Sequence, residues 1–278
     1  MENPNHDILV AYDFTDVAMD AVAHAVFFSK VLETGITLLH IVKKEDEVSE
    51  MEEQLQIDAK KVNEIYNITP STVVRAGTIF KTINDVAHEL GCMMVVMGTH
   101  GMKGLQKLTG SWALKVIVGS KVPFLVVQGP PRINADMGKV VFPVDFKTEN
   151  KEKLKWAQFM SKYFGSKVFL FSATSKDGVV ESRTKANLVF SKAFLEEKNV
   201  NYELILSPET STFSQETIDF AESKNADMII ITTTRDIAFH DYILAAHEQF
   251  LIANSAKIPV LVINPRTDLM KYGYGNFG

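Results

Sequence analysis

The residues best placed to do chemistry follow an apolar run at positions 93–97. This run leads directly into Gly98-Thr99-His100-Gly101, and Gly110-Ser111 follows after a further eight residues. Glycines let the backbone turn sharply and approach a ligand without a Cβ in the way. A helix that begins near Gly110 would offer N–H groups and the positive end of its dipole to an anion. The spacing predicts a phosphate cradle, and a turn-rich loop in which Ser111 is the helix N-cap is the alternative explanation.

A carboxylate closes another apolar run, at positions 8–12. Asp13 could accept hydrogen bonds from a ribose or a base, or help to hold Mg²⁺. It could equally cap the helix that begins just after it. Asp145 closes a similar run in the second half of the chain, where the glycines are missing. The second half therefore serves as an internal comparison for both features.

The two halves of the chain repeat the same pattern of apolar runs. Asp13 and Asp145 are 132 residues apart, and Pro123 and Pro259, which open two similar closing strands, are 136 apart. The small difference between these two spacings is typical of two diverged copies joined by a short linker. We expect a first domain over 1–129, a linker over 130–138, a second domain over 139–267 and a tail over 268–278.

The apolar runs predict five strands in each half, and these strands alternate with helices. The expected strands are 8–15, 36–42, 71–75, 93–97, 122–127, 140–147, 167–171, 202–206, 228–231 and 258–263. The expected helices are 16–32, 45–66, 79–90, 110–117, 150–164, 182–198 and 213–224. Strands that are apolar almost throughout indicate a parallel sheet covered by helices on both faces. Ligands of such sheets bind at the carboxyl ends of the strands, where Asp13, Ile41, Gly98 and Gly101 should share one rim.

Composition excludes several classes of function. The chain has 278 residues, 46% of them apolar and 23% charged, with a net charge of −5 and no long basic block, so nucleic-acid binding through a basic face is disfavoured. No apolar stretch approaches the roughly 20 residues of a membrane helix, and the polar, acidic start is unlike a signal peptide. We therefore expect a cytoplasmic protein that does not bind membranes. The lone Cys92 lies among apolar residues and predicts a core position.

The remaining candidates for chemistry are weaker. His240 and His247 are two helical turns apart, and they could supply part of a metal site or simply lie on a solvated helix face, which we favour because no third ligand is evident. His40 could form a local hydrogen bond at the end of a strand. The sequence contains no recognisable Ser/His/Asp set, paired carboxylates or reactive cysteine. It favours binding over catalysis.

Together these motifs resemble a tandem universal stress protein. The likeness covers Asp13 and its strand, the strand that contains His40, the segment 96–101, Gly110-Ser111 and the closing strand 122–127. It implies an α/β fold of two tandem open parallel five-stranded α/β sandwich domains, as in adenine-nucleotide alpha-hydrolase-like proteins. Members with the pattern Gly-x2-Gly-x9-Gly-Ser/Thr bind ATP. The resemblance implies ATP, with or without Mg²⁺, held by residues that contact the nucleoside (Asp13), line the base pocket (Ala11, Ile41, Met97) or hold the phosphates (Gly98, Gly101, Gly110, Ser111 and the backbone of Trp112).

This sequence departs from the family pattern in two places. The second gap, from Met102 to Thr109, has eight residues rather than nine, and the second half has Thr232 and Arg235 where the first has Gly98 and Gly101. The resemblance implies a stress-response protein whose first domain binds an adenine nucleotide in a regulatory role. The second domain is then structural or contacts an unidentified protein partner. A slow ATPase that uses Asp13 and His100, or a nucleotide-free interaction module with a closed pocket, are the alternatives.

The resemblance also bears on assembly. Family members commonly dimerise by pairing their closing strands in antiparallel fashion, and unpaired apolar strand edges invite association. We therefore expect strands 122–127 and 258–263 to pair within the chain as a pseudo-dimer. Pairing of the same strands between two chains would give a homodimer.

Overall fold

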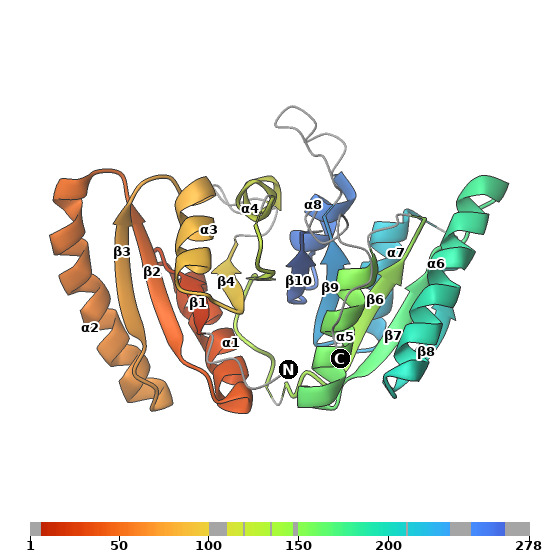
Figure 1. The fold of residues 1–278 in the computed structure, drawn as a ribbon, viewed down its shortest axis with the longest axis horizontal. Coiled ribbons are helices and arrows are strands. Elements are labelled where there is room, and N and C mark those ends of the chain that lie inside the picture. The colour runs from red at the N-terminus through yellow and green to blue at the C-terminus, as the bar shows by residue number, and fades with distance from the viewer. Residues whose placement is uncertain are drawn as a thin grey trace.

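The computed structural model describes residues 7–99, 110–118, 120–133, 135–146, 150–209, 211–233 and 246–264. The first half contains β1 (Ile8–Ala11), α1 (Asp16–Leu32), β2 (Ile36–Val42), η1 (Glu45–Glu47), α2 (Val48–Tyr66), β3 (Ser71–Ala76), α3 (Ile79–Glu89), β4 (Met94–Gly98), α4 (Gly110–Ile117) and β5 (Phe124–Val127). The second contains β6 (Lys139–Val144), α5 (Asn150–Phe164), β7 (Lys167–Ser172), α6 (Gly178–Glu197), β8 (Tyr202–Leu206), α7 (Phe213–Ser223), β9 (Met228–Thr232), α8 (Ala246–Ile252) and β10 (Val260–Ile263). Figure 1 shows the elements of the first half on the left and those of the second half on the right.

The described strands form one ten-stranded sheet in the order β3-β2-β1-β4-β5-β10-β9-β6-β7-β8. Every neighbouring pair is parallel except β5 and β10, which pair antiparallel with Leu125 opposite Leu261. The predicted α/β class and the predicted pairing of the two closing strands within the chain are confirmed. Since β5 lies between β4 and β10, and β10 between β5 and β9, neither strand keeps a free edge for a homodimer.

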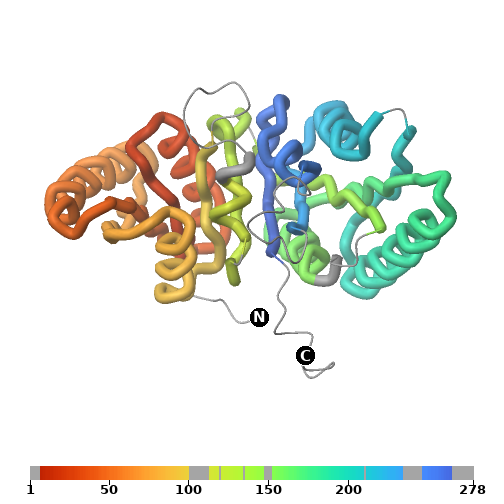
Figure 2. Tube along the Cα trace, turned by 90° about the horizontal axis from the view of Figure 1, so that it is seen from above, coloured from red at the N-terminus to blue at the C-terminus, as the bar shows by residue number. Residues whose placement is uncertain are grey.

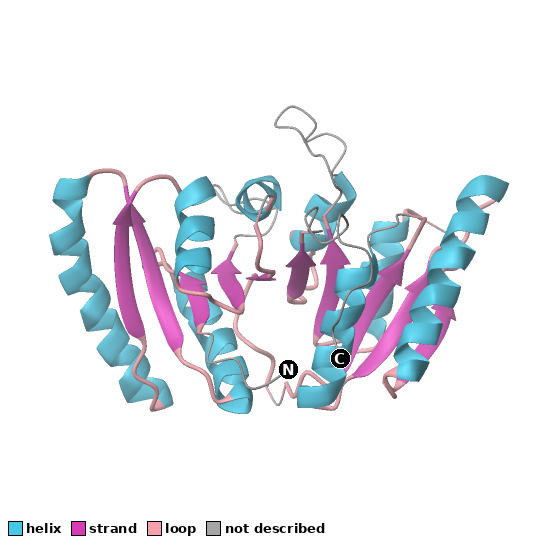
Figure 3. Ribbon diagram, viewed as in Figure 1, coloured by secondary structure: helices cyan, strands magenta, loops and turns pink. Residues whose placement is uncertain are grey.

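Helices cover both faces of the sheet. In Figures 2 and 3 they flank the strands in each half. Residues of α1 and α2 share one core with the sheet, whereas α3, α4, α7 and α8 contribute to a second core on the other face. This second core is continuous from β2 to β7, and α4 packs against α8 at the junction of the halves. No described helix is both long and apolar enough to cross a membrane.

Most elements form where the apolar pattern predicts them, and local chemistry moves their ends. β1 ends at Ala11, earlier than expected, because Phe14 adopts a left-handed backbone with φ 63° and Thr15 then caps α1. α6 begins before position 182 because Asp177 caps it. β5 and β10 begin only after Pro123 and Pro259, consistent with the missing N–H of proline. Cys92 is buried as expected but precedes β4 rather than lying in a strand.

A buried histidine joins α1 to the segment that follows β5. His24 of α1 is 2% exposed, and its Nε2 lies 3.1 Å from the carbonyl oxygen of Gly129. Burial lowers the pKa of His24 from 6.5 to about 4, while the contact with the Gly129 carbonyl opposes this shift. The imidazole is therefore neutral in the folded protein at pH 7.

This burial predicts that the protein loses stability in acid. The unfolded state binds a proton at His24 below pH 6.5, whereas the folded state resists it down to about pH 4. The contribution of His24 to the free energy of unfolding is fully present above pH 6.5 and should fall by about 2 kcal/mol between pH 7 and pH 5. Urea unfolding at the two pH values measures the loss.

His24→Gln should remove that part of the pH dependence. His88→Gln provides the control because His88 is exposed at the end of α3 and should leave the pH dependence unchanged. An equal loss of stability in acid for His24→Gln and for the unaltered chain would contradict the assignment.

Candidate functional site

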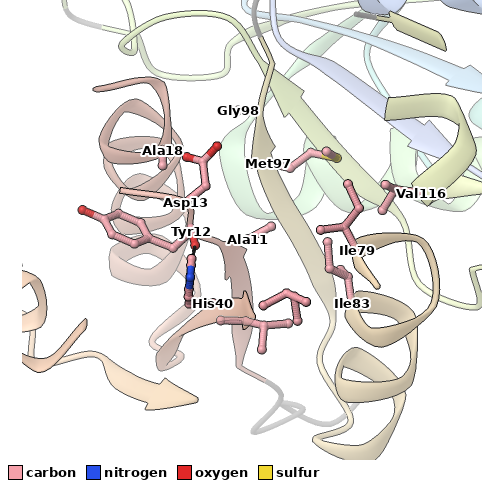
Figure 4. Close-up of a pocket in the computed structure, with 12 residues that line it drawn as sticks. Ala11, Tyr12, Asp13, Ala18, His40, Ile79, Ile83, Met97, Gly98 and Val116 are labelled. Atoms are coloured by element: carbon pink, nitrogen blue, oxygen red, sulfur yellow. Dashed lines mark hydrogen bonds between the residues drawn. The ribbon is translucent and has the colours of Figure 1, made fainter. Parts of the chain in front are cut away.

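A cavity of about 260 Å³ opens at the carboxyl ends of β1, β2 and β4. Its walls are mostly apolar: Ala11, Ala18, Leu39, Ile41, Ile79, Ile83, Met97 and Val116, with Tyr12, Asp13, His40 and Gly98 completing the lining. In Figure 4, Asp13 and His40 lie on one side of the cavity, and Ile79, Ile83 and Val116 lie on the other. The volume is close to the lower end of small-molecule pockets, which begin at about 300 Å³. The cavity is suited to a flat apolar group with a polar rim.

The structure brings five of the predicted site residues together around this cavity. They are Ala11, Asp13, Ile41, Met97 and Gly98. Gly101 and His100 lie outside the described residues. For Gly110, Ser111 and Trp112 the backbone lies in the first turn of α4, and their side chains are not described. Because α4 begins at Gly110, Ser111 lies inside the helix, and its predicted N-cap position is wrong.

Asp13 lies exposed on the rim of the cavity and is not the N-cap of α1. That role belongs to Thr15, whose Oγ1 accepts a hydrogen bond of 3.3 Å from the N–H of Ala18. The Thr15 hydroxyl in turn donates to Oδ1 of Asp13, and the Thr15 N–H lies 3.3 Å from the same oxygen. The capping interpretation of Asp13 is thus corrected: Asp13 orients the capping residue and points its carboxylate to the cavity mouth.

A small aromatic cluster holds the backbone of the rim in place. His40 Nδ1 donates a hydrogen bond of 2.8 Å to the carbonyl of Tyr12, which confirms the local bond expected for His40. The ring of Phe14 packs against both, with centroids 4.6 Å from His40 and 5.4 Å from Tyr12. A non-glycine residue at positive φ is strained, so these contacts must compensate for the backbone of Phe14. The cluster fixes Asp13 between two anchored neighbours.

Tyr12 is tied to the outer helix as well. Its hydroxyl donates to Oδ2 of Asp58 in α2 at 2.9 Å, and Lys61 Nζ lies 2.7 Å from the other oxygen of Asp58. Burial, followed by the hydrogen bond to Asp58, raises the pKa of Tyr12. The tyrosine therefore remains a neutral donor, and the end of β1 is braced from the side away from the cavity.

Gly98 has a structural reason to be glycine that does not involve a ligand. A Cβ at this position would lie 2.5 Å from the carbonyl oxygen of Val17 and 2.9 Å from its carbonyl carbon. The first turn of α1 can approach the end of β4 only because this side chain is absent. Close helix–strand packing thus accounts for one glycine that the sequence assigned to a phosphate cradle.

Sequence reasoning missed several residues of the cavity. Ile79 and Ile83 are one helical turn apart at the start of α3, and Val116 lies in α4. The i, i+4 spacing of the two isoleucines was a usable signal, but the same spacing is typical of any buried helix face. Only the fold shows that this face ends at the strand tips.

The metal-site alternative gains no support from the described part of the chain. No group of three or more His, Cys, Asp or Glu residues there could hold a metal ion. His240 lies outside the described residues. His247 is exposed on α8, and its Nδ1 is hydrogen-bonded to the hydroxyl of Ser214 at 2.6 Å.

Comparison with known proteins identifies the family of the half that contains this cavity. Residues 4–128 match the model of the Universal stress protein family. These residues form a universal stress protein domain. A universal stress protein of Methanocaldococcus jannaschii is 26% identical over 147 residues, which is 47% of this chain and 86% of the relative. The resemblance found in the sequence is thereby confirmed for the first half.

Two solved structures resemble the whole chain. A universal stress protein from Archaeoglobus fulgidus covers 95% of this chain and 100% of its own length, with a TM-score of 0.77 and 19% identity. A putative universal stress protein from Pseudomonas aeruginosa covers 95% and 94%, with a TM-score of 0.61 and 16% identity. At such identities the likeness shows the fold alone. It is consistent with a tandem arrangement, and the domain boundaries at 129 and 139 stay predictions.

The close packing around Gly98 predicts that Gly98→Ala lowers the free energy of unfolding of the universal stress protein domain. The added Cβ would contact backbone atoms of Val17 that cannot rotate away, and overpacking of this kind costs about 1–3 kcal/mol. The measurement is chemical unfolding. Gly178→Ala is the matched control, because a Cβ there meets nothing within 4 Å and alanine favours the helix. Equal stabilities of the two variants would contradict the packing role of Gly98.

Proposed function

We propose that the first domain binds an adenine nucleotide, ATP in the form that the family resemblance implies. The observation that supports this proposal most directly is the shape and chemistry of the cavity. It is an apolar slot closed on one side by Asp13, and it opens at the carboxyl ends of parallel strands, the usual position of ligands in this class of sheet. The match of residues 4–128 to the universal stress protein family supports it independently.

The slot suits a purine base. Ile41 of β2 and Met97 of β4 line it from the strands, and Ile79 and Ile83 approach from α3. Flat aromatic ligands gain from such contacts because apolar surface on both partners leaves water. The carboxylate of Asp13 at the mouth can accept hydrogen bonds from the two ribose hydroxyls. The base would lie inside the slot and the sugar at its rim.

The phosphates would then extend toward α4. This helix begins at Gly110, and the N–H groups of its first turn together with the helix dipole favour an anion. Mg²⁺ fits only as a companion of the phosphates, since the described residues provide Asp13 as the one acidic side chain of the cavity. A bound metal ion would neutralise phosphate charge there. The chain itself contributes the carboxylate of Asp13 at the rim as a hydrogen-bond acceptor.

We propose a regulatory role rather than turnover for the nucleotide. The described part of the cavity contains no nucleophile with an adjacent base: its polar lining residues are Tyr12, Asp13 and His40, the Tyr12 hydroxyl is bonded to Asp58 and His40 is bonded to a backbone carbonyl. The second domain would supply structure or a surface for a protein partner. Phosphate release that depends on Asp13 would instead favour the slow ATPase.

The test is an equilibrium titration of the full chain with ATP. We expect saturable binding, weakened about tenfold or more by Asp13→Ala, because a hydrogen bond to a charged group contributes about 1.5–3 kcal/mol. Asp145→Ala is the matched control, since Asp145 occupies the same place in the second half. Ala11→Phe should abolish binding by filling the slot.

Two results would overturn the proposal. One is the absence of ATP binding by a chain that folds normally. The other is equal affinity of Asp13→Ala, Ala11→Phe and the unaltered chain, which would place the nucleotide elsewhere. Absorbance at 260 nm in the supernatant of heat-treated protein shows whether a nucleotide accompanies the purified chain.

A further inference from the structure

A second cavity, of about 270 Å³, lies at the corresponding place in the second half. It opens at the carboxyl ends of β6, β7 and β9, and residues of α5, α6, α7 and α8 complete its walls. Asp145 and Thr232 line it as Asp13 and Gly98 line the first. The register supports this correspondence, because Gly98 pairs with Val127 and Thr232 with Ile263, the last residues of the two closing strands.

The floor of this second cavity differs from that of the first. β1 and β4 pair over four residues, as far as Ala11 and Met97, whereas β6 and β9 pair only at Val140 and Val141. Pro143 stands where Ala11 does, and proline has no N–H to donate to a neighbouring strand. The ladder of paired residues between β6 and β9 therefore stops below the cavity.

A lysine places its charge beside the end of this ladder. Lys153 of α5 is 4% exposed, its Nζ donates a hydrogen bond of 2.5 Å to the carbonyl of Pro143, and the same nitrogen lies 4.1 Å from the centre of the Phe142 ring. The 132-residue offset between the halves places Lys153 where the first half has the fully buried Ala21. The second half thus carries a buried positive charge at a position that the fold fills with a methyl group elsewhere.

A buried carboxylate lines the same cavity from the opposite face of the sheet. Glu248 of α8 is 3% exposed. When α4 and α8 are aligned at their final residues, Ile117 and Ile252, Glu248 stands where the first half has the buried Ala113. Removing each charge from water costs several kcal/mol. The first half shows that the fold needs neither charge.

The remaining walls combine apolar and hydroxyl groups. Phe213, Ile231 and Leu251 line the cavity, and the ring of Phe213 stacks on Phe171 with centroids 5.6 Å apart. Ser214, 4% exposed, is held by its hydrogen bond to His247. The cavity is therefore a small apolar chamber with one buried charge of each sign, Lys153 and Glu248, and with the half-buried carboxylate of Asp145 as a further lining group.

We propose that this cavity binds a small zwitterion, an α-amino acid with an apolar side chain. A ligand with one charge would face a buried group of its own sign, whereas a ligand with both matches its carboxylate to Lys153 and its ammonium group to Glu248. The apolar side chain would lie against Phe213, Ile231 and Leu251. This site is separate from the nucleotide cavity, and its occupation does not depend on ATP.

Calorimetric titration of the full chain with L-leucine and L-phenylalanine tests the proposal. We expect binding, and binding weaker by about tenfold or more for 4-methylpentanoate and for 3-methylbutylamine, which lack the ammonium group and the carboxylate of leucine, respectively. Glu248→Gln and Lys153→Met should lower the affinity for the amino acid to a similar degree and leave the affinity for ATP unchanged.

Thr232→Trp keeps the test informative if either charge variant fails to fold. Thr232 is half-buried at the rim of the second cavity, so an indole there should block the amino acid without altering a buried charge. Asp13→Ala in the first half is the control and should bind the amino acid normally. The proposal is overturned if neither amino acid binds, if a singly charged analogue binds as tightly as leucine, or if Thr232→Trp has no effect.

Discussion

The antiparallel ladder between β5 and β10 is the contact on which the architecture depends. It consists of three residue pairs, Phe124 with Val262, Leu125 with Leu261 and Val126 with Val260, all of them buried. Two five-stranded sheets of the same strand order thereby become one sheet with a continuous core on one face. A parallel pairing of the two strands would place the carboxyl ends of all ten strands along one edge. The antiparallel pairing instead relates the halves as a two-fold axis relates the subunits of a dimer, and each half has its own cavity at the carboxyl ends of its strands.

Polar side chains reinforce this ladder at its ends. Gln128 Nε2 donates to the carbonyl of Ile252 at 2.8 Å, and Asn264 Nδ2 donates to the carbonyl of Ser120 at 3.2 Å. Arg132, in the predicted linker, donates to the carbonyl of Ala226 at 3.1 Å. Each bond connects the halves through a backbone carbonyl, which cannot turn away as a side chain can. The relative position of the two cavities is therefore fixed by strand pairing and by these bonds together.

Much of the fold could be predicted because its strands are buried on both faces. Such strands are short apolar runs separated by helices with one apolar face. The number of strands and their positions along the chain therefore follow from the pattern of hydrophobicity. The ends of elements depend on single residues instead. Positive φ at Phe14 and the caps Thr15 and Asp177 moved predicted boundaries by a few residues. Patterns of hydrophobicity do not encode these local choices.

The candidate site was predictable only where it follows strand ends. Asp13, Ile41 and Gly98 were found because parallel strands bring their carboxyl ends to one edge. Ile79 and Ile83 come from a helix whose apolar face is indistinguishable in sequence from a core face. Lys153 escaped notice for the opposite reason, because a lysine in a charged helix looks like a residue of the wet face. Its burial becomes evident only once the structure places its Nζ on the carbonyl of Pro143.

The glycine motif illustrates how one residue can satisfy two requirements. Gly98 must lack a side chain because the carbonyl of Val17 lies within 2.5 Å of where its Cβ would be. The same absence leaves the cavity mouth open beside Asp13. The second half separates the two requirements, since it accommodates Thr232 at the equivalent position and still keeps a cavity. A glycine at this position is thus required by the close packing of α1 in the first half. The two cavities differ in the side chains around their openings. The first has apolar residues and one rim carboxylate, and the second has buried charges of both signs.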